Sequence, residues 1–225
     1  MNPNNEQAFS FEKTQQTFLQ RVYQWMSIGL ALTGVIAYMA SGNMGLMRSL
    51  AGGGFLVLMI AEFALVWWLS ANVLTLSPSA AVTGFLVYSG LNGLTLSYLF
   101  LVYTGASIAM TFFITAATFA SVSIYGYTTK TSLASLQSFF FMGIIGILIA
   151  SLVNMFLHSP MLYWMISYLG VGLFMGLTAF DTQKLKALQE RGGATEQLAV
   201  FGALMLYLDF INMFIFLMRI LGRRK

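Results

Sequence analysis

Cysteine is absent from this sequence, histidine occurs once, and charged residues make up only 8% of the chain. Without cysteine there are no disulfides and no thiolate metal sites. The single histidine, His158, stands in a short turn before Pro160, which argues against a histidine-based metal or catalytic site. Soluble domains carry about 25% charged residues. A soluble fold is therefore excluded, because the chain has too little polar side chain to cover its surface.

Apolar residues instead make up 58% of the chain and lie in long runs. A helix needs about 20 apolar residues to cross a ~30 Å hydrocarbon core. In the bilayer only helices and closed barrels satisfy their backbone hydrogen bonds, and runs without alternation favour helices. We therefore predict an all-α integral membrane protein with seven transmembrane helices. Their predicted positions are about 22–41, 51–71, 79–102, 105–127, 133–156, 160–182 and 198–219.

We expect one membrane domain, 22–221, between a polar N-terminal tail, 1–21, and a basic C-terminal tail, 222–225. The N-terminal tail shows no cleavable signal peptide. We expect it to end in a short amphipathic helix through Phe9, Phe11 and Phe18. The net charge of +4 comes from basic residues at segment ends, where lipid headgroups explain them. The lipid bilayer is thus an expected partner, and nucleic acid is not.

Basic residues leave the orientation open. If all seven segments cross, six basic residues lie on one face and five on the other. If the last segment enters and returns without crossing, the count becomes ten against one, which the positive-inside rule favours. The length of 198–219 favours a full crossing. The side of the C-terminus therefore stays open, with a preference for a cytoplasmic N-terminus. The two faces would hold Lys13, Arg21, Lys130, Lys184, Lys186 and Arg191, and Arg48, Arg219, Arg223, Arg224 and Lys225.

Three acids lie inside the apolar segments or at their ends: Glu62, Asp181 and Asp209. A charge near the bilayer centre costs at least about 2.5–3.5 kcal/mol, and such groups mark ion or proton paths by default. No lysine or arginine lies deep in any segment to pair with them. A buried carboxylate without such a partner tends to take up a proton, and two close together share one. The sequence predicts an ion path or pH sensor; the alternative is a hydrogen-bonded pair that fixes helix register.

Asp181 and Asp209 lie on the two segments that the charged stretch 184–196 connects. Antiparallel neighbours joined by a short loop bring their connected ends together. Asp209 lies about 16 Å along its helix at 1.5 Å per residue. Contact between the two acids therefore requires the sixth helix to continue past Asp181 to about Glu190.

Two polar residues are spaced to support this pair. Asn212 follows Asp209 by three residues and Thr178 precedes Asp181 by three, so each is expected to hydrogen-bond its neighbouring carboxylate. Carboxylates without thiol or imidazole partners suit Ca²⁺ or protons better than zinc. Asp181 and Asp209 are thus the candidate Ca²⁺ ligands, and no cofactor is predicted. The supporting candidates are Glu62, Asn212 and Thr178.

No nucleophilic triad, phosphate loop or nucleotide motif is visible, so no enzyme activity is predicted. Intramembrane aspartyl proteases also use two membrane aspartates that share a proton. Those enzymes carry a Gly-x-Gly-Asp motif, whereas Asp181 follows the sequence Leu-Thr-Ala-Phe. The protease hypothesis is therefore disfavoured.

Glycine is abundant, with 21 residues, and many lie inside the apolar segments. Small residues let helices approach closely in lipid, and Gly172 and Gly176 have the GxxxG spacing. We expect close packing as the main role of these glycines, with flexibility for gating as the alternative.

Three stretches around the acids form a set. GALMLYLDFINMF at 202–214 surrounds Asp209, TAFDTQKLK at 178–186 surrounds Asp181, and AEFALVWW at 61–68 contains Glu62. The first resembles the C-terminal signature of the Bax inhibitor-1 family, the TMBIM or YccA-like proteins. The second resembles the acid-bearing end of that family's sixth helix, and Glu62 matches a second-helix acid of many members. The resemblance covers about 22–221 and is to a bacterial member.

This resemblance implies a fold in which two layers of three helices enclose the seventh, C-terminal helix. It also implies a pH-sensitive calcium leak channel in the bacterial cytoplasmic (inner) membrane, with two aspartates as the sensor. These map onto Asp181 and Asp209, and calcium ions and protons are the implied partners. Some relatives are instead described as modulators of a membrane protease. The alternative function is therefore a non-conducting regulator that binds another membrane protein.

One feature of the family has no counterpart here. In a bacterial relative, an arginine near the end of the second helix latches the aspartate pair when the protein is closed. The corresponding stretch, 67–76, contains no basic residue. Either another group latches the pair, or the chain is not gated in that way.

Overall fold

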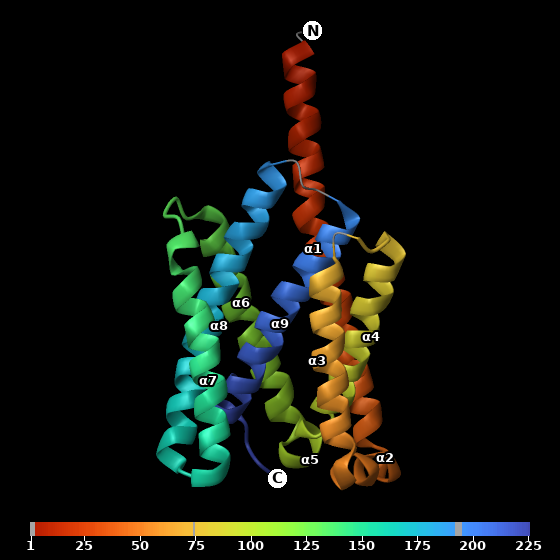
Figure 1. Ribbon diagram of the computed structural model, residues 1–225, viewed down its shortest axis with the longest axis vertical. Coiled ribbons are helices and arrows are strands. Elements are labelled where there is room, and N and C mark those ends of the chain that lie inside the picture. The colour runs from red at the N-terminus through yellow and green to blue at the C-terminus, as the bar shows by residue number, and fades with distance from the viewer. Residues whose placement is uncertain (1–2, 74, 192–194) are drawn as a thin grey trace. The chain divides into compact units, whose positions relative to one another are not determined.

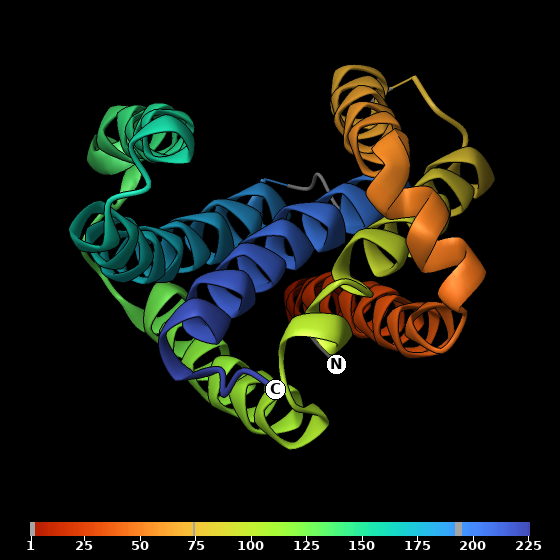
Figure 2. The ribbon, with the colours of Figure 1, turned by 90° about the horizontal axis from the view of Figure 1, so that it is seen from below.

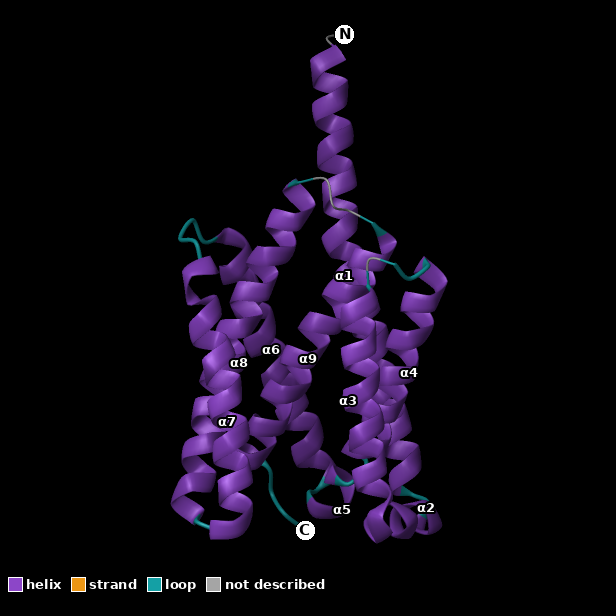
Figure 3. Ribbon diagram, in the orientation of Figure 1, coloured by secondary structure: helices purple, strands orange, loops and turns teal. Residues whose placement is uncertain are grey.

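The computed structural model describes residues 3–73, 75–191 and 195–225, with the backbone alone for 3–17. Over these ranges every regular element is a helix, as Figure 3 shows. Seven helices are long and apolar enough to cross a membrane, which confirms the all-α, seven-helix prediction. The predicted amphipathic helix lies within the first helix, but the side chains of Phe9 and Phe11 fall outside the described residues.

The helices follow one another with short connections (Figure 1). Three of the candidate membrane spans match the predicted segments 79–102, 105–127 and 133–156 to within one residue at both ends. The other four are longer than predicted, by two to eight residues at one or both ends. The elements are α1 (Pro3–Ser41), α2 (Met44–Ser49), the π-helical turn η1 (Leu50–Gly54), α3 (Phe55–Asn72), α4 (Pro78–Leu96), α5 (Leu99–Val102), α6 (Gly105–Thr128), the 3-10 turn η2 (Ala134–Leu136), α7 (Gln137–Leu157), α8 (Pro160–Glu190) and α9 (Glu196–Leu221).

Local sequence sets several helix ends. The side chains of Asn43, Ser77 and Thr104 each accept a hydrogen bond from a backbone N–H in the first turn of the following helix. These caps satisfy donors that a helix start leaves unpaired. His158 ends α7 in the left-handed conformation, with φ of 49°. The single histidine thus has a structural place at a helix end.

The second predicted segment is interrupted by a kink. Gly53 has φ of 106°, and Gly52 is also non-helical, so η1 separates α2 from α3. A side chain at either glycine would meet open space, which means that close packing does not explain them. Glycine is needed at Gly53 because its φ is one that other residues rarely adopt. For these two residues the packing expectation was wrong.

The described residues form two compact units. The first comprises α1 to α5 with Ala187–Tyr207, and the second comprises Tyr103–Lys186 with Leu208–Lys225. Helix α9 therefore contributes its first half to one unit and its second half to the other. The prediction of a single domain over 22–221 stays a prediction.

In the first unit α4 packs against both α1 and α3, as Figure 2 shows. A Cβ at Gly93 would lie 2.8 Å from the carbonyl oxygen of Thr33, so α4 and α1 meet backbone to backbone. The beginning of α9 is tied to α1 by Glu196, which accepts hydrogen bonds from Arg21 at 2.8 Å and from the Trp25 indole at 2.9 Å.

In the second unit α8 packs against α6 and α7. A Cβ at Gly126 of α6 would overlap the backbone of Ala179, and one at Gly176 would lie 2.6 Å from the Phe140 ring of α7. Nothing lies within 4 Å of a Cβ built at Gly172. The two glycines of the GxxxG pattern therefore do not form a shared helix contact, although Gly176 alone serves the predicted packing role.

Helices α8 and α9 carry the acid pair. Helix α8 continues to Glu190, as the contact between Asp181 and Asp209 was predicted to require. Helix α9 runs unbroken over 26 residues, which is about 39 Å at 1.5 Å per residue. This length and continuity support a full crossing by the last segment rather than a segment that enters and returns.

Candidate functional site

Asp181 and Asp209 belong to the same compact unit, one on α8 and the other on α9. Asp181 is 9% exposed and Asp209 is 4% exposed. The charge of Asp181 acts on the carboxyl group of Asp209. No residue of the described chain hydrogen-bonds Oδ2 of Asp209. The structure thus brings the two predicted acids into one buried region and leaves an acceptor there without a protein donor.

Lys184 supplies the positive charge that acts on Asp181. It follows Asp181 by three residues on α8, so the two side chains lie about one turn apart. Lys184 lies toward the end of α8. Its position is therefore consistent with the observation that no basic residue lies deep in a predicted membrane segment. Lys184 offsets part of the charge on Asp181. Because both residues belong to α8, this charge contact does not link two helices.

The supporting hydrogen bonds expected from helical spacing are not formed. Asn212 Nδ2 donates to the carbonyl of Leu208 at 2.8 Å, and Thr178 Oγ1 donates to the carbonyl of Phe174 at 2.7 Å. Both side chains therefore bond their own helix one turn back. The reason is that a carbonyl at i−4 is always within reach of a helical side-chain donor, whereas a carboxylate must also have the right rotamer.

Two other hydroxyls in this unit were missed by sequence reasoning. Ser123 of α6 and Thr182 of α8 are buried, and neither oxygen has a hydrogen-bond partner in the described chain. The sequence did contain a signal for Ser123, because serine and threonine recur at intervals of four residues along α6, and the structure shows that these hydroxyl residues are buried. These are Ser107, Thr111, Thr115 and, after Phe119, Ser123.

Glu62 lies in the first unit, on α3. Thr95 of α4 donates a hydrogen bond to its Oε1, and its charge acts on the hydroxyl of Tyr88. Asn92 Nδ2 donates to that hydroxyl at 3.4 Å. The three α4 residues are spaced at i, i+4 and i+7, a polar stripe in an apolar helix that marks the partner face. Glu62 thus has neighbours of its own in the first unit.

Tyr207 of α9 and Thr33 of α1 extend the polar interior of this unit. Their hydroxyl oxygens are 2.7 Å apart, and Thr33 donates to the carbonyl of Ser89 at 2.8 Å. Tyr207 must then donate to Thr33, because the Thr33 proton is already used. The Tyr207 ring meets the Tyr88 ring edge to face at 6.0 Å. The hydroxyls of Thr33 and Tyr207 are therefore both hydrogen-bonded, and neither residue brings a carboxylate.

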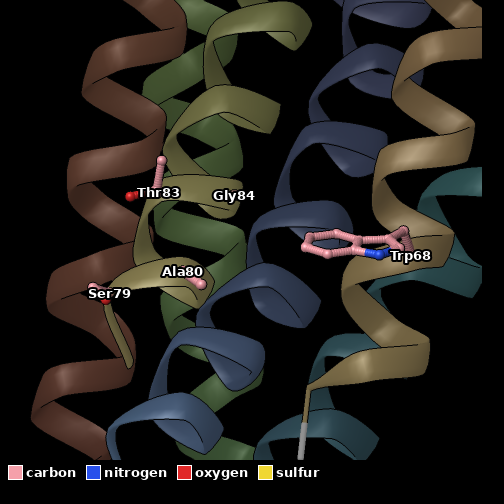
Figure 4. A pocket seen from close by; sticks show the side chains of 5 residues that line it. All are labelled: Trp68, Ser79, Ala80, Thr83 and Gly84. Carbon is pink, nitrogen blue, oxygen red and sulfur yellow. The ribbon is translucent and has the colours of Figure 1, made fainter. Parts of the chain in front are cut away.

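A shallow groove of about 410 Å³ lies between α3 and α4 of the first unit (Figure 4). Trp68 borders it on α3, and Ser79, Ala80, Thr83 and Gly84 border it on α4. None of these residues carries an ionisable side chain. The groove therefore offers shape but no group for proton or cation chemistry.

Metal binding would depend on neutral oxygens as well as on the acids. Among the described residues no three histidine, cysteine, aspartate or glutamate side chains form a group that could hold a metal ion. Ca²⁺ takes six to eight oxygen ligands. A calcium ion beside Asp181 and Asp209 would thus need hydroxyls, carbonyls or water to complete its ligand set.

Known proteins resemble this chain over nearly its whole length. The family model described as "Inhibitor of apoptosis-promoting Bax1" matches residues 15–225. The chain is 47% identical over 217 residues to the inner membrane protein YbhL of Escherichia coli, with 93% of each chain covered. It is 44% identical to an uncharacterized protein of Borreliella burgdorferi, with 92% of each covered. It is 41% identical to one of Rickettsia prowazekii, with 96% of this chain and 93% of that protein covered.

Proposed function

The chain belongs to the Bax inhibitor-1 family, and from that premise we propose that it is a pH-sensitive calcium leak channel with Asp181 and Asp209 as its sensor. It is a multi-pass membrane protein, located in the bacterial cytoplasmic (inner) membrane as the name of its E. coli relative states for that protein. The observation that carries the proposal is the acid pair itself. Two buried carboxylates interact within one unit, and Oδ2 of Asp209 has no donor among the residues that the structure describes.

The proposed mechanism follows from the charge of this pair. When both carboxylates are ionised, they attract a divalent cation and the water that accompanies it. When the pair takes up protons, this attraction is lost. The neutral carboxyl groups can then be buried without water, which favours close packing of the helices around them. Calcium flux is therefore expected to fall as the pH is lowered through the range in which the pair is protonated. Lys184 offsets part of the negative charge of Asp181, whereas the charge that acts on Asp209 is that of Asp181.

Flux into proteoliposomes loaded with a calcium dye tests this proposal. We expect wild-type flux to fall between pH 8 and pH 5, and we expect Asp181→Asn and Asp209→Asn to remove that dependence. Glu190→Gln is the matched control, because it neutralises an exposed acid on the same helix as Asp181 and should leave the pH profile unchanged. Flux that responds neither to pH nor to Asp209→Asn would refute the sensor.

A second outcome would favour the regulatory alternative. If folded, inserted protein gives no more flux than empty liposomes, the leak proposal fails. Capture of a membrane protein partner that survives both Asp181→Asn and Asp209→Asn would then favour a non-conducting regulator.

A further inference from the structure

Ser123 is a buried hydroxyl without a protein partner. It is 6% exposed, and no residue in the described part of the chain hydrogen-bonds its Oγ. Buried polar groups in folded proteins are nearly always paired, because an unpaired one loses its hydrogen bonds to water without replacement. An unpaired hydroxyl inside a membrane protein therefore points to a partner other than the protein itself.

Other hydroxyls of the same helix behave differently. Thr115 Oγ1 donates to the carbonyl of Thr111 at 2.8 Å, and Ser121 Oγ donates to the carbonyl of Ala117 at 2.8 Å. This bond to the i−4 carbonyl is the usual local solution for serine and threonine in helices. Ser123 does not form it, so both its proton and its lone pairs remain available to a group in the interior.

The contacts of α6 place Ser123, along the helix axis, at a level between those of the two acids. Four residues before Ser123, the ring of Phe119 meets that of Phe210, the residue after Asp209, at 5.6 Å between centroids. Three residues after Ser123, Gly126 approaches the backbone of Ala179, two residues before Asp181. Phe119, Ser123 and Gly126 are all buried on α6. Along this helix, Ser123 therefore lies between the level of Asp209 and the level of Asp181.

A hard divalent cation needs more oxygen ligands than two carboxylates provide. Two aspartates supply at most four oxygens, whereas Ca²⁺ takes six to eight, drawn from carboxylates, neutral oxygens and water. From the position of the unpaired hydroxyl, we infer that Ser123 is a third protein residue that supplies an oxygen to a calcium ion held between Asp181 and Asp209. This inference rests on the proposed calcium function. The charged groups around the ion are the two aspartates and Lys184, which leaves Ser123 as a neutral ligand.

Calcium binding, rather than flux, tests this role. Calcium is titrated calorimetrically at pH 8 into the full chain in lipid nanodiscs. We expect Ser123→Ala to weaken binding about fivefold, as the loss of one net polar interaction implies. Ser123→Cys, which keeps the shape but offers a soft sulfur, should also weaken it. Ser123→Thr, which keeps the hydroxyl, should bind calcium more tightly than either.

Two matched controls separate a ligand from a packing residue. Ser121→Ala removes an exposed hydroxyl two residues away, and Thr115→Val removes a buried hydroxyl that is already bonded to its own helix. Both should bind calcium as the wild type does. Wild-type affinity in folded Ser123→Ala, or an equal loss in the controls, would overturn the inference, as would wild type that binds no calcium.

Parallel flux measurements distinguish this inference from the proposed function. Ser123-dependent binding without any flux would contradict the leak and leave the calcium site in place. Flux that depends on pH, with binding indifferent to Ser123, would leave the leak in place and remove Ser123 from the site.

Discussion

At the scale of single residues, Tyr207 shows how a polar group is accommodated in an apolar interior. Its side chain is fully buried, its ring meets Phe85 edge to face at 5.6 Å, and its hydroxyl is 2.7 Å from Thr33 Oγ1. The ring supplies packing and the hydroxyl supplies a bond between α9 and α1. The two contributions can be separated by mutation.

Tyr207→Phe should remove the hydroxyl bond while keeping the ring. We expect a loss of about 1 kcal/mol in the free energy of unfolding, because Thr33 keeps its bond to Ser89 and is not left unpaired. Tyr38→Phe is the control, since the Tyr38 side chain is 70% exposed and should change stability by less than about 0.5 kcal/mol. Titration with SDS in mixed micelles measures both. Equal effects would mean that the buried bond contributes nothing.

Single residues also show what a sequence can indicate. Asp181 and Asp209 stand out because a charge in an apolar run has few explanations. Asn212 and Thr178 were predicted to hydrogen-bond the two acids, yet their donors bond carbonyls of their own helices instead. Ser123 gives little signal alone, because a serine in a membrane helix is ordinary; its spacing from the other α6 hydroxyls is a weak sign, and its missing bond is visible only in the structure.

At the scale of helices, α6 and α8 of the second unit approach each other closely at Gly126. A methyl group there would overlap the backbone of Ala179, and backbone atoms cannot move aside as a flexible side chain can. Gly146 of α7 lies in open space instead. The same substitution at these two glycines should therefore have opposite effects.

Gly126→Ala should destabilise the protein by about 1–3 kcal/mol, the usual cost of overpacking. Gly146→Ala should be neutral or should stabilise by up to about 1 kcal/mol, because alanine favours the helix more than glycine does. Thermal unfolding of the two purified variants in detergent compares them directly. A tolerated Gly126→Ala, with an unchanged unfolding temperature, would mean that α6 and α8 are not packed in this way.

The helices themselves were largely predictable, because bilayer thickness fixes their length and lipid fixes their composition. The extension of α8 to Glu190 was also predictable, from the depth of Asp209. The kink at Gly53 was not, since three successive glycines are compatible with either close packing or a break. Which helix faces meet depends on contacts between distant segments, and periodicity along one segment does not contain that information.

At the scale of the whole chain, the unbroken α9 brings the number of candidate crossings in the described part of the chain to seven. An odd number of crossings places the two ends of the chain on opposite sides of the membrane. The absence of cysteine makes this testable, because a single introduced thiol has no background.

Single cysteines at Gln20 and Thr131 should react with a membrane-impermeant maleimide from one side, and those at Ser159 and Lys225 from the other. Labelling of intact cells and of inverted vesicles reads out the side for each of the four variants, Gln20→Cys, Thr131→Cys, Ser159→Cys and Lys225→Cys. Thr131→Cys and Ser159→Cys serve as internal references. Labelling of Lys225→Cys from the same side as Gln20→Cys would show that the last segment turns back.

The bonds between α1 and α9 have a consequence for how this protein is made. Arg21 and Glu196 are 175 residues apart, and Thr33 and Tyr207 are 174 apart. A ribosome adds about 5–20 residues per second, so roughly 9–35 s separate the synthesis of these partners. Throughout that interval the first helix waits in the membrane with Thr33 and Trp25 lacking their partners from α9. The nascent chain therefore depends on lipid, water or the insertion machinery to shield these groups until its last helix emerges.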